Sequence, residues 1–264
     1  MLPYFNTSGP CIRGEHYMLA PERRLDEVLA LIESRRYFTL HAGRQTGKTT
    51  SLMWLEEHLQ ASGRWSAIWV DLETARELPD VGQAMAAILD AFDRRLGSRR
   101  PDWPRPDAAA RAAMLATPNS ALGHYLSRLA AHTEHPLVLL LDEVDGLVGP
   151  AMVSFLTQLR EGYIARSQTP FPISVVLVGQ RQVRDYVLDQ ADRRTLAWLG
   201  TTSPFNITAE ATTLAPFTAA EVSELLAQHT ALTGQRFSPE AVARIYELGS
   251  GHPWLSNALA DQVV

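Results

Sequence analysis

The sequence predicts an α/β protein in which a parallel, doubly wound sheet is followed by a small all-helical domain. Four or five short strand candidates alternate with stretches of helical spacing, which is the pattern of βαβ units. One of these strands runs into a glycine-rich turn, and from Thr218 onward the pattern is wholly helical. We therefore expect an N-terminal segment and helix over residues 1–36, a core over 37–215 and a helical domain over 216–264.

The composition is that of an ordinary globular protein. Of the 264 residues, 46% are hydrophobic and 20% are charged, and the formal net charge of -5 argues against a general nucleic-acid binder. A single cysteine, Cys11, excludes an intramolecular disulfide and a cysteine-based zinc site. Because the N-terminus resembles no signal peptide and the longest aliphatic run, Leu137 to Leu141, is too short to span a bilayer, we expect a cytoplasmic protein without membrane association.

The first helix and the first strand lead to the most informative stretch. Turn-forming residues are followed by a helix from about Pro21 to Ser34, whose apolar residues fall on one face. The strand that begins at Tyr37 continues into the sequence AGRQTGKTT over residues 42–50, and residues of helical spacing follow. A glycine-rich turn between a strand and a helix predicts a phosphate-binding loop of the Walker A type.

The residue types of this loop suit a nucleoside triphosphate. Successive backbone N–H groups that open into a helix N-terminus offer donors and a positive dipole end to phosphates. Lys48 can reach the β- and γ-phosphates, and the Thr49 hydroxyl can ligate Mg²⁺. The usual pattern, G-x-x-x-x-G-K-[ST], has glycine where this chain has Ala42, so we expect the loop to form provided that this position has no positive φ. The binding residues predicted here are Ala42, Gly43, Arg44, Gln45, Thr46, Gly47, Lys48, Thr49 and Thr50.

A second strand is predicted at Ala67 to Asp71, with a helix near Val81 to Arg95. The prolines that follow forbid regular structure, so residues 97–107 are expected to form an exposed loop. Six arginines lie between Arg94 and Arg111 with a tryptophan among them. This segment is either a patch for nucleic acid or a partner, or simply a solvated loop.

Two carboxylates follow the third predicted strand. The aliphatic run Leu137 to Leu141 ends in Asp142 and Glu143, a pattern of the Walker B type that places both side chains at the carboxyl end of a buried parallel strand. Asp142 would hold Mg²⁺, and Glu143 would orient and deprotonate the attacking water. Asp145 either caps the next helix, Ala151 to Ala165, or serves a partner.

The remaining elements are a fourth strand and the helical domain. Ile173 to Val178 is predicted to be a strand that runs into Arg181, which either senses the γ-phosphate or is an ordinary surface arginine. A short fifth strand is considered at 205–207. Thr218 with Glu221 forms a capping-box pattern, and further helices are predicted from Ser238 and from Pro253.

These motifs together carry a family resemblance. The segments FNTSGPC, HYMLAPERR, AGRQTGKTT, LLLDEVD, LVGQRQVRDY, TGQRFSPEA and GHPWLSNALA occur in this order. The chain resembles bacterial AAA-like P-loop ATPases related to the STAND and origin-recognition class. The resemblance implies a five-stranded core, with a strand added between those bearing the phosphate loop and the acidic pair, and a helical lid over the nucleotide. It also implies that His16 and Tyr17 touch the adenine, that Pro253 packs near the base, and that Gly179 and Arg181 belong to a γ-phosphate sensor.

The sequence is compatible with four functions. The leading hypothesis is a slow or partner-dependent ATPase that uses ATP and Mg²⁺ and acts as a molecular switch through an unidentified protein partner or self-assembly. The alternatives are a DNA-transaction ATPase, a non-hydrolysing nucleotide-binding module and, more weakly, a P-loop kinase. Nucleic acid is less favoured because the chain is acidic. The lack of an Asn/Thr-Lys-x-Asp motif favours adenine over guanine, and Arg193 and Arg194 are the candidates for an arginine finger.

Overall fold

The chain folds into two units in the computed structural model, which describes residues 2–180 and 208–264. The sheet unit comprises Glu27–His41 and Leu55–Thr212, and the loop-and-helix unit comprises Met1–Asp26, Ala42–Trp54 and Thr213–Val264. The N-terminal segment and the phosphate-loop residues therefore share a unit with the C-terminal helices. Sequence periodicity gave no sign of this association.

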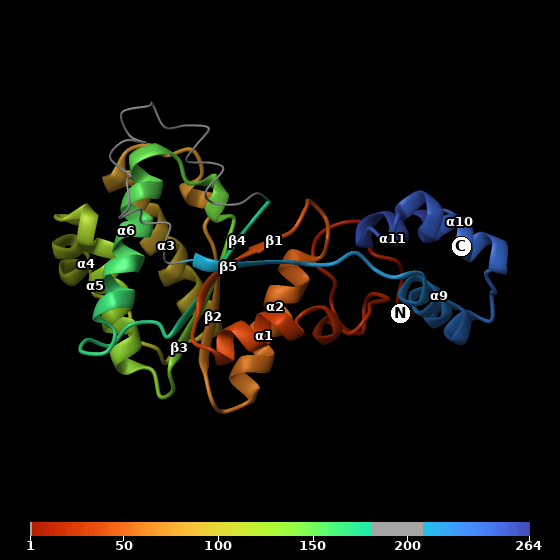
Figure 1. Cartoon of the computed structure of the whole chain (residues 1–264), viewed down its shortest axis with the longest axis horizontal. Coiled ribbons are helices and arrows are strands. Elements are labelled where there is room, and N and C mark those ends of the chain that lie inside the picture. The colour runs from red at the N-terminus through yellow and green to blue at the C-terminus, as the bar shows by residue number, and fades with distance from the viewer. Residues whose placement is uncertain (1, 181–207) are drawn as a thin grey trace. The chain divides into compact units, whose positions relative to one another are not determined.

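The sheet unit is built on five strands in the order β2-β3-β4-β1-β5 (Figure 1). Their bounds are β1 (Tyr37–His41), β2 (Ser66–Asp71), β3 (Leu137–Asp142), β4 (Ser174–Gly179) and β5 (Thr208–Thr213). The pairs β1 with β4, β4 with β3, and β3 with β2 are all parallel. The predicted parallel, doubly wound sheet is confirmed, with β4 added between β1 and β3. The fifth strand considered at 205–207 lies outside the described residues, and β5 begins directly after it.

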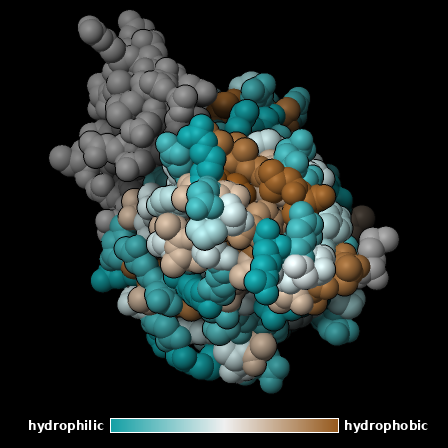
Figure 2. Space-filling view, turned by 90° about the vertical axis from the view of Figure 1, so that its right-hand side faces the viewer, coloured by the Kyte–Doolittle hydropathy of each residue, from teal (hydrophilic) through white to brown (hydrophobic). Residues whose placement is uncertain are grey.

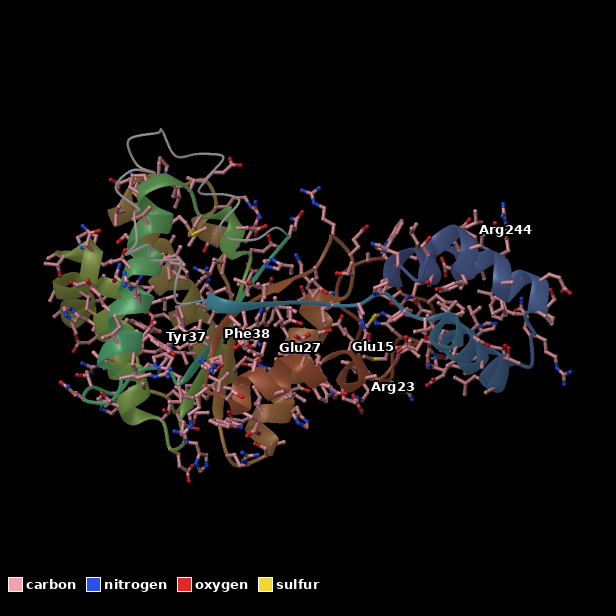
Figure 3. All side chains as sticks on the ribbon, in the orientation of Figure 1. Glu15, Arg23, Glu27, Tyr37, Phe38 and Arg244 are labelled. Atoms are coloured by element: carbon pink, nitrogen blue, oxygen red, sulfur yellow. The ribbon has the colours of Figure 1, made fainter. Side chains whose placement is uncertain are left out.

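Helices lie on both faces of this sheet because the strands β1 to β4 are largely buried on both sides. The helices are α1 (Asp26–Glu33), α2 (Lys48–Ala61), α3 (Val81–Arg99), α4 (Ala108–Leu115), α5 (Pro118–His132) and α6 (Gly149–Ala165). Figure 1 shows α3 to α6 on the face opposite α1 and α2. The main core joins strand residues such as Ile68, Leu139 and Val175 to Phe92 and Phe155 of the helices. Tyr37 and Phe38 of β1 are also buried (Figure 3).

The segment 97–107 is exposed or half-buried throughout, and its first residues belong to helix α3. Helix α3 continues to Arg99, beyond the end expected near Arg95, and Trp103 packs against the core of the sheet unit. Three arginines of the region are engaged by carboxylates. The ion pairs are Arg95 with Glu56, Arg99 with Glu57, and Arg111 with Asp90 and Asp93. These pairs, which the local sequence cannot reveal, hold the end of α3 and the chain after it against the unit.

The loop-and-helix unit carries three C-terminal helices, α9 (Ala219–Thr233), α10 (Pro239–Gly249) and α11 (Pro253–Asp261). The capping box of Thr218 and Glu221 forms as predicted, and Ser238 caps α10, which has proline in its first turn. The core of this unit joins Phe5 and Tyr17 of the N-terminal segment to Phe217, Val222 and other apolar residues of the C-terminal region. The association of the N-terminal segment with the helices therefore rests on shared apolar burial.

The outer surface of the C-terminal helices is mixed in character. Leu232 of α9 and Leu248 of α10 are about half exposed, and Figure 2 shows hydrophobic and hydrophilic residues side by side on this side of the chain. None of the helices within residues 2–180 and 208–264 has the length and apolar character that crossing a membrane requires.

Candidate functional site

The predicted phosphate loop lies between the end of β1 and the start of α2. Gln45 and Gly47 have φ values of 58° and 84°, so the turn uses the left-handed region at these two positions. Ala42 is buried and is not among the residues with positive φ. Alanine is therefore compatible with this position of the loop, because without a positive φ its methyl group causes no backbone strain.

Two side chains from distant segments bind carbonyl groups of this loop. Both terminal nitrogens of Arg24 donate to the carbonyl oxygen of Thr46, at 3.2 and 3.3 Å, and Nε2 of His252 lies 3.0 Å from the carbonyl oxygen of Arg44. In a trans peptide the C=O and the following N–H point in opposite directions. The two contacts therefore turn the amides of Gln45 and Gly47 toward the other side of the loop, where successive N–H groups can bind an anion.

The hydrogen bonds of His252 also fix its tautomer. Its Nδ1 accepts the backbone N–H of Leu255 at 3.4 Å, which caps α11, so in the neutral ring the proton is carried by Nε2 and is donated to Arg44. Arg24 is held in a similar way, because it also donates to the carbonyl oxygen of Ala215 and lies 5.1 Å from the centre of the Phe217 ring. Each side chain thus connects the phosphate loop to the C-terminal part of its unit.

The first turn of α2 carries the predicted cation and hydroxyl. Lys48 begins the helix and is buried, and Thr49 and Thr50 are partly buried. The Thr50 hydroxyl accepts the backbone N–H of Cys11 at 2.9 Å, which ties the N-terminal segment to this turn. Within the loop, the Thr46 hydroxyl donates to the carbonyl oxygen of Gly43 at 2.9 Å. Hydrogen bonds within the protein therefore hold the loop and the first turn of α2 in place.

A narrow pocket of about 60 Å³ adjoins the loop. Its walls are mostly apolar and come from the N-terminal segment, the loop and the C-terminal helices: Cys11, Tyr17, Met18, Leu19, Ala20, Pro21, Arg24, Gly47, Thr50, Ser51, Phe217, Leu225, Pro253 and Asn257. This volume is far below the roughly 300–1,000 Å³ of sites that enclose a whole ligand. The pocket can therefore enclose only a small part of a ligand.

Tyr17 and Pro253 lie in the walls of this pocket, where the resemblance put them beside the adenine. The Tyr17 hydroxyl is 3.2 Å from Nδ1 of His229, and its ring packs on Phe5. His16 is not part of the wall. Its Nδ1 accepts the N–H of Ile12 at 2.8 Å, and its ring packs edge-on against Tyr4. His16 thus organises the N-terminal turn in this structure.

The two predicted carboxylates lie at the end of β3 in the sheet unit. Asp142 is the last residue of the strand, is 2% exposed, and accepts the backbone N–H of Glu143 at 3.0 Å. Glu143 has a φ of 55°, an uncommon conformation for a residue other than glycine. This left-handed conformation ends the strand, so the side chains of Glu143 and Asp142 leave the backbone in different directions.

Arg76, from the segment after β2, binds Glu143. One of its terminal nitrogens lies 2.7 Å from the Glu143 carboxylate, and the guanidinium also binds both oxygens of Glu73 at 2.7 Å. The hydrogen bonds of Arg76 hold the pKa of the Glu73 carboxyl below its usual value, and that carboxylate in turn raises the pKa of Arg76. Arg76 therefore stabilises the ionised form of Glu73 and also contacts the Glu143 carboxylate at this end of the sheet.

Asp145 joins the end of β3 to the end of β4. It lies in a short 3₁₀ turn, Val144–Gly146, and accepts the backbone N–H of Gln180 at 2.8 Å. The N-cap of α6 is Val148, so Asp145 does not cap that helix. Gly179 passes so close to the Asp145 carboxyl that an added Cβ would lie 3.0 Å from its Cγ. Arg181, Arg193 and Arg194 fall outside the described residues.

Each unit offers an oxygen ligand of the type that Mg²⁺ prefers, Thr49 in the loop-and-helix unit and Asp142 in the sheet unit. Mg²⁺ that accompanies nucleotides is bound by one or two carboxylates together with phosphates and water. Among residues 2–180 and 208–264, no group of three or more His, Cys, Asp or Glu side chains could hold a metal ion. A magnesium nucleotide needs no such group.

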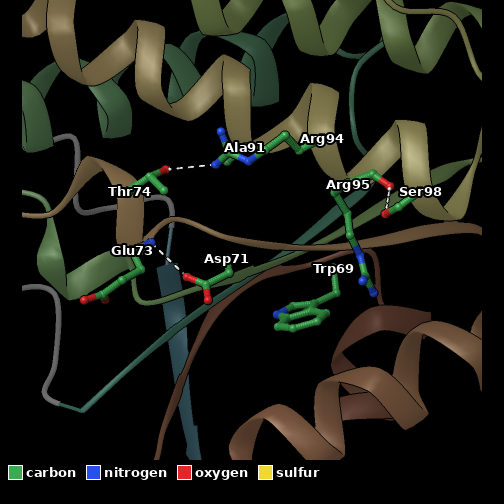
Figure 4. A pocket seen from close by; sticks show the side chains of 8 residues that line it. All are labelled: Trp69, Asp71, Glu73, Thr74, Ala91, Arg94, Arg95 and Ser98. Carbon is green, nitrogen blue, oxygen red and sulfur yellow. Dashed lines mark hydrogen bonds between the residues drawn. The ribbon is translucent and has the colours of Figure 1, made fainter.

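Another pocket, of about 310 Å³, lies in the sheet unit between the end of β2 and α3 (Figure 4). It is lined by Trp69, Asp71, Glu73, Thr74, Ala91, Arg94, Arg95 and Ser98. Asp71 accepts the N–H of Glu73 and Glu73 is bound by Arg76, while Arg95 stacks on the Trp69 ring and is paired with the buried Glu56. Opposite charges thus balance one another within the described structure, and no glycine-rich turn adjoins the pocket.

Sequence reasoning missed four residues that shape these sites. Arg24 and His252 bind the loop carbonyls, Asn257 lies in the pocket wall, and Arg76 binds Glu143. Arg24 follows another arginine, and nothing in the sequence distinguishes the two. His252 stands within the Gly-x-Pro pattern, where only the proline had been singled out.

Comparison with known proteins supports a nucleotide-binding fold. The family described as AAA domain matches residues 32–187. Three solved structures are similar: the Walker-type ATPase paby2304 of Pyrococcus abyssi (TM-score 0.67, 15% identity), Cdc6p of Pyrobaculum aerophilum (0.59, 18%), and the ORC2 protein of Aeropyrum pernix in ADPNP–ADP complexes (0.52, 16%).

These matches cover most of this chain and a smaller part of the other proteins. They include 99%, 98% and 92% of this chain, but 71%, 63% and 60% of the respective structures. At such low identity the likeness is one of fold. No protein of curated function matches the chain.

Proposed function

Because the chain belongs to the AAA domain family, with more than half of its length matched, we propose that it is an ATP-binding, magnesium-dependent ATPase that acts as a molecular switch. The observation that carries this proposal is the orientation of the phosphate loop. Two of its carbonyls are bound by Arg24 and His252, which turns the amides that follow them, those of Gln45 and Gly47, away from these two side chains. An anion-binding surface is thus organised by the protein itself.

The binding roles follow from this arrangement. The loop amides and the N-terminus of α2 would bind phosphate oxygens, and Lys48 would add its charge at the β- and γ-phosphates. The apolar pocket beside the loop would take the base, with Tyr17 and Pro253 in its wall. The base and the phosphates would therefore be bound by residues of one unit, drawn from both ends of the chain.

The chemical roles belong mainly to the end of β3. Asp142 and the Thr49 hydroxyl would hold Mg²⁺, which screens the phosphate charges when bound. Glu143 would accept a hydrogen bond from the attacking water and take its proton as the water oxygen bonds to the γ-phosphorus and the bond from that phosphorus to the ADP oxygen breaks. Arg181 would sense the γ-phosphate. A partner or a second copy of the chain would supply any arginine finger, for which Arg193 and Arg194 are candidates.

The switch would act through the contacts between the phosphate loop and the C-terminal helices. His252 caps α11 and binds the loop with the same ring, so a change in the loop on loss of the γ-phosphate would be felt at the start of that helix. Arg24 binds Thr46 and Ala215 together and would transmit the same change to the segment before α9. The helices α9–α11 would then form the surface that a partner protein binds.

The alternative of a DNA-transaction ATPase receives less support from the described arginines. Arg95, Arg99 and Arg111 are engaged by acidic side chains, and Trp103 packs against the core rather than standing free for stacking on bases. We therefore do not assign partner binding to residues 97–107. A salt-dependent affinity for duplex DNA would reverse this preference.

The proposal is tested by ATP hydrolysis and thermal unfolding of wild type, Glu143→Gln and Glu161→Gln, the last a control at an exposed position of α6. ATP at about 100 times its Kd should stabilise the fold by about 2.7 kcal/mol, a rise in Tm of roughly 5–10 °C for a chain of this size. Turnover should disappear in Glu143→Gln alone, with the rise in Tm retained. Absence of both turnover and stabilisation in the wild type would refute the proposal.

A further inference from the structure

One polar atom in the wall of the narrow pocket has no hydrogen-bond partner. Asn257 of α11 is 6% exposed, and its Oδ1 is buried without a partner in the described structure. Leaving a buried acceptor unsatisfied costs the free energy of removing it from water, so such atoms are rare in folded proteins and call for an explanation. Asn257 is the pocket-lining residue, among those described, that carries one.

The orientation of this amide is fixed by its other end. Nδ2 of Asn257 lies 2.9 Å from the carbonyl oxygen of Pro253, one turn earlier in the same region. A carbonyl oxygen can only accept, so the nitrogen of the amide must face Pro253 and the oxygen must face away from it. The unsatisfied atom is therefore an acceptor, and what it lacks is a donor.

Three other polar side chains of the pocket wall, Tyr17, Arg24 and Thr50, already have partners. The Tyr17 hydroxyl meets His229, the Arg24 guanidinium binds Thr46 and Ala215, and the Thr50 hydroxyl accepts from Cys11. The rest of the wall is largely apolar, with Leu19, Phe217, Leu225 and Pro253. Such a wall can hold the faces of a planar ring, but it cannot by itself distinguish one purine from another.

We propose that Oδ1 of Asn257 accepts a hydrogen bond from the exocyclic 6-amino group of adenine and thereby sets a preference for ATP over 6-oxopurine triphosphates such as GTP. This inference rests on the proposed function and adds the residue that reads the base. Adenine carries an amino donor at this position, whereas guanine and hypoxanthine carry a carbonyl acceptor. A carbonyl placed against Oδ1 would set two acceptors against each other and leave both unsatisfied.

The test compares three triphosphates that differ at one position of the base. Calorimetry would measure the Kd of ATP, of purine riboside triphosphate, which has hydrogen in place of the 6-amino group, and of inosine triphosphate, which has a carbonyl there. Wild type should bind ATP about tenfold more tightly than purine riboside triphosphate and should bind inosine triphosphate more weakly still. In Asn257→Leu, which keeps the size of the side chain and removes the acceptor, ATP and purine riboside triphosphate should bind equally.

Ser256→Ala is the matched control. Ser256 is the preceding residue of α11, is fully buried and also has an unsatisfied oxygen, but it is not in the pocket wall. This variant should keep the wild-type ratio of affinities. If Asn257→Leu does not fold, the wild-type comparison of the three triphosphates and the smaller change Asn257→Ala carry the test.

The outcomes separate the two proposals. Tight binding of ATP with an unchanged ratio in the Asn257 variants would overturn the role of Asn257 and leave the ATPase proposal standing. Equal binding of ATP and purine riboside triphosphate by wild type would have the same meaning. Binding of no triphosphate by wild type would overturn both.

Discussion

The loop-and-helix unit and the sheet unit hold their functional groups in different ways. In the first, the groups that would meet the phosphates are backbone amides, and their direction is set by Arg24 and His252 from opposite ends of the chain. In the second, the groups are the side chains of Asp142 and Glu143, placed by the end of one strand. Nucleotide binding should therefore depend on distant residues, whereas the chemistry at β3 should depend on its immediate surroundings.

Of the substitutions that test this difference between the units, removal of the Lys48 cation should have the largest effect. Lys48→Ala should weaken ATP binding by at least about 100-fold, because a charge-assisted contact with phosphate is worth several kcal/mol when one partner is truncated. Calorimetry without Mg²⁺ isolates this effect from the metal. Under the same conditions Asp142→Asn should leave the affinity within about threefold of wild type. Equal losses in the two variants would show that binding is not confined to the loop side.

The integrity of the loop-and-helix unit can be disturbed at one glycine. Gly251 has a φ of 71°, and a Cβ at this position would overlap the carbonyl oxygen of Phe217. Gly251→Ala should therefore lower the free energy of unfolding by about 3 kcal/mol, from backbone strain and overpacking together. Denaturant unfolding followed by tryptophan fluorescence would measure the loss.

Gly234→Ala provides the control for the backbone alone. Gly234 ends α9 with a φ of 78°, and nothing lies within 4 Å of an added Cβ. The cost at this position should be about 1 kcal/mol, from the left-handed conformation only. Similar losses for both glycines would mean that the close approach to Phe217 contributes nothing.

The role of Arg24 can be separated from that of its neighbour. Arg24→Met keeps most of the aliphatic length but removes the donors to Thr46 and Ala215, so ATP affinity should fall about tenfold as the loop carbonyls lose their partner. Arg23→Met is the matched control. Arg23 is half exposed at the surface (Figure 3) and pairs with Glu224, so its loss should leave the affinity unchanged.

A smaller effect is expected at the sheet unit. Arg76 binds Glu143 through a partly exposed ion pair, and such pairs are worth about 1 kcal/mol or less. Arg76→Ala should therefore raise the rate of ATP hydrolysis by about threefold, because the Glu143 oxygen that Arg76 binds becomes available to accept a hydrogen bond from the attacking water. The rate of ATP hydrolysis by Arg76→Lys should lie between the rates of wild type and Arg76→Ala. A change in ATP affinity instead of rate would contradict the separation of the units' roles.

The sequence predicted the elements that local patterns encode. The parallel sheet follows from aliphatic runs alternating with helices, and the helix starts at Thr218 and Ser238 follow from capping residues. The position of Ala42 was also correctly judged, because the substitution depends on one backbone angle. These features depend on residues within a few positions of one another, which is why they could be predicted.

Features made by distant residues could not be predicted in this way. Arg24 and Arg23 are adjacent and identical, yet only the former reaches the loop. Asn257 is one polar residue in an amphipathic helix, and its lack of a partner is visible only when the surrounding groups are known. The pairing of arginines with carboxylates in residues 94–111 likewise needs α2, α3 and α4 to be in place.

Cys11 gives the chain a native position for a chemical reporter. It is the sole thiol of the sequence, and it lies in the wall of the narrow pocket beside the phosphate loop. Burial raises the pKa of this thiol, so alkylation at neutral pH should be slow, and a ligand that fills the pocket should slow it further. The rate of this alkylation would therefore report on occupancy of the pocket without engineered cysteines, so ligands could be screened on the unaltered sequence.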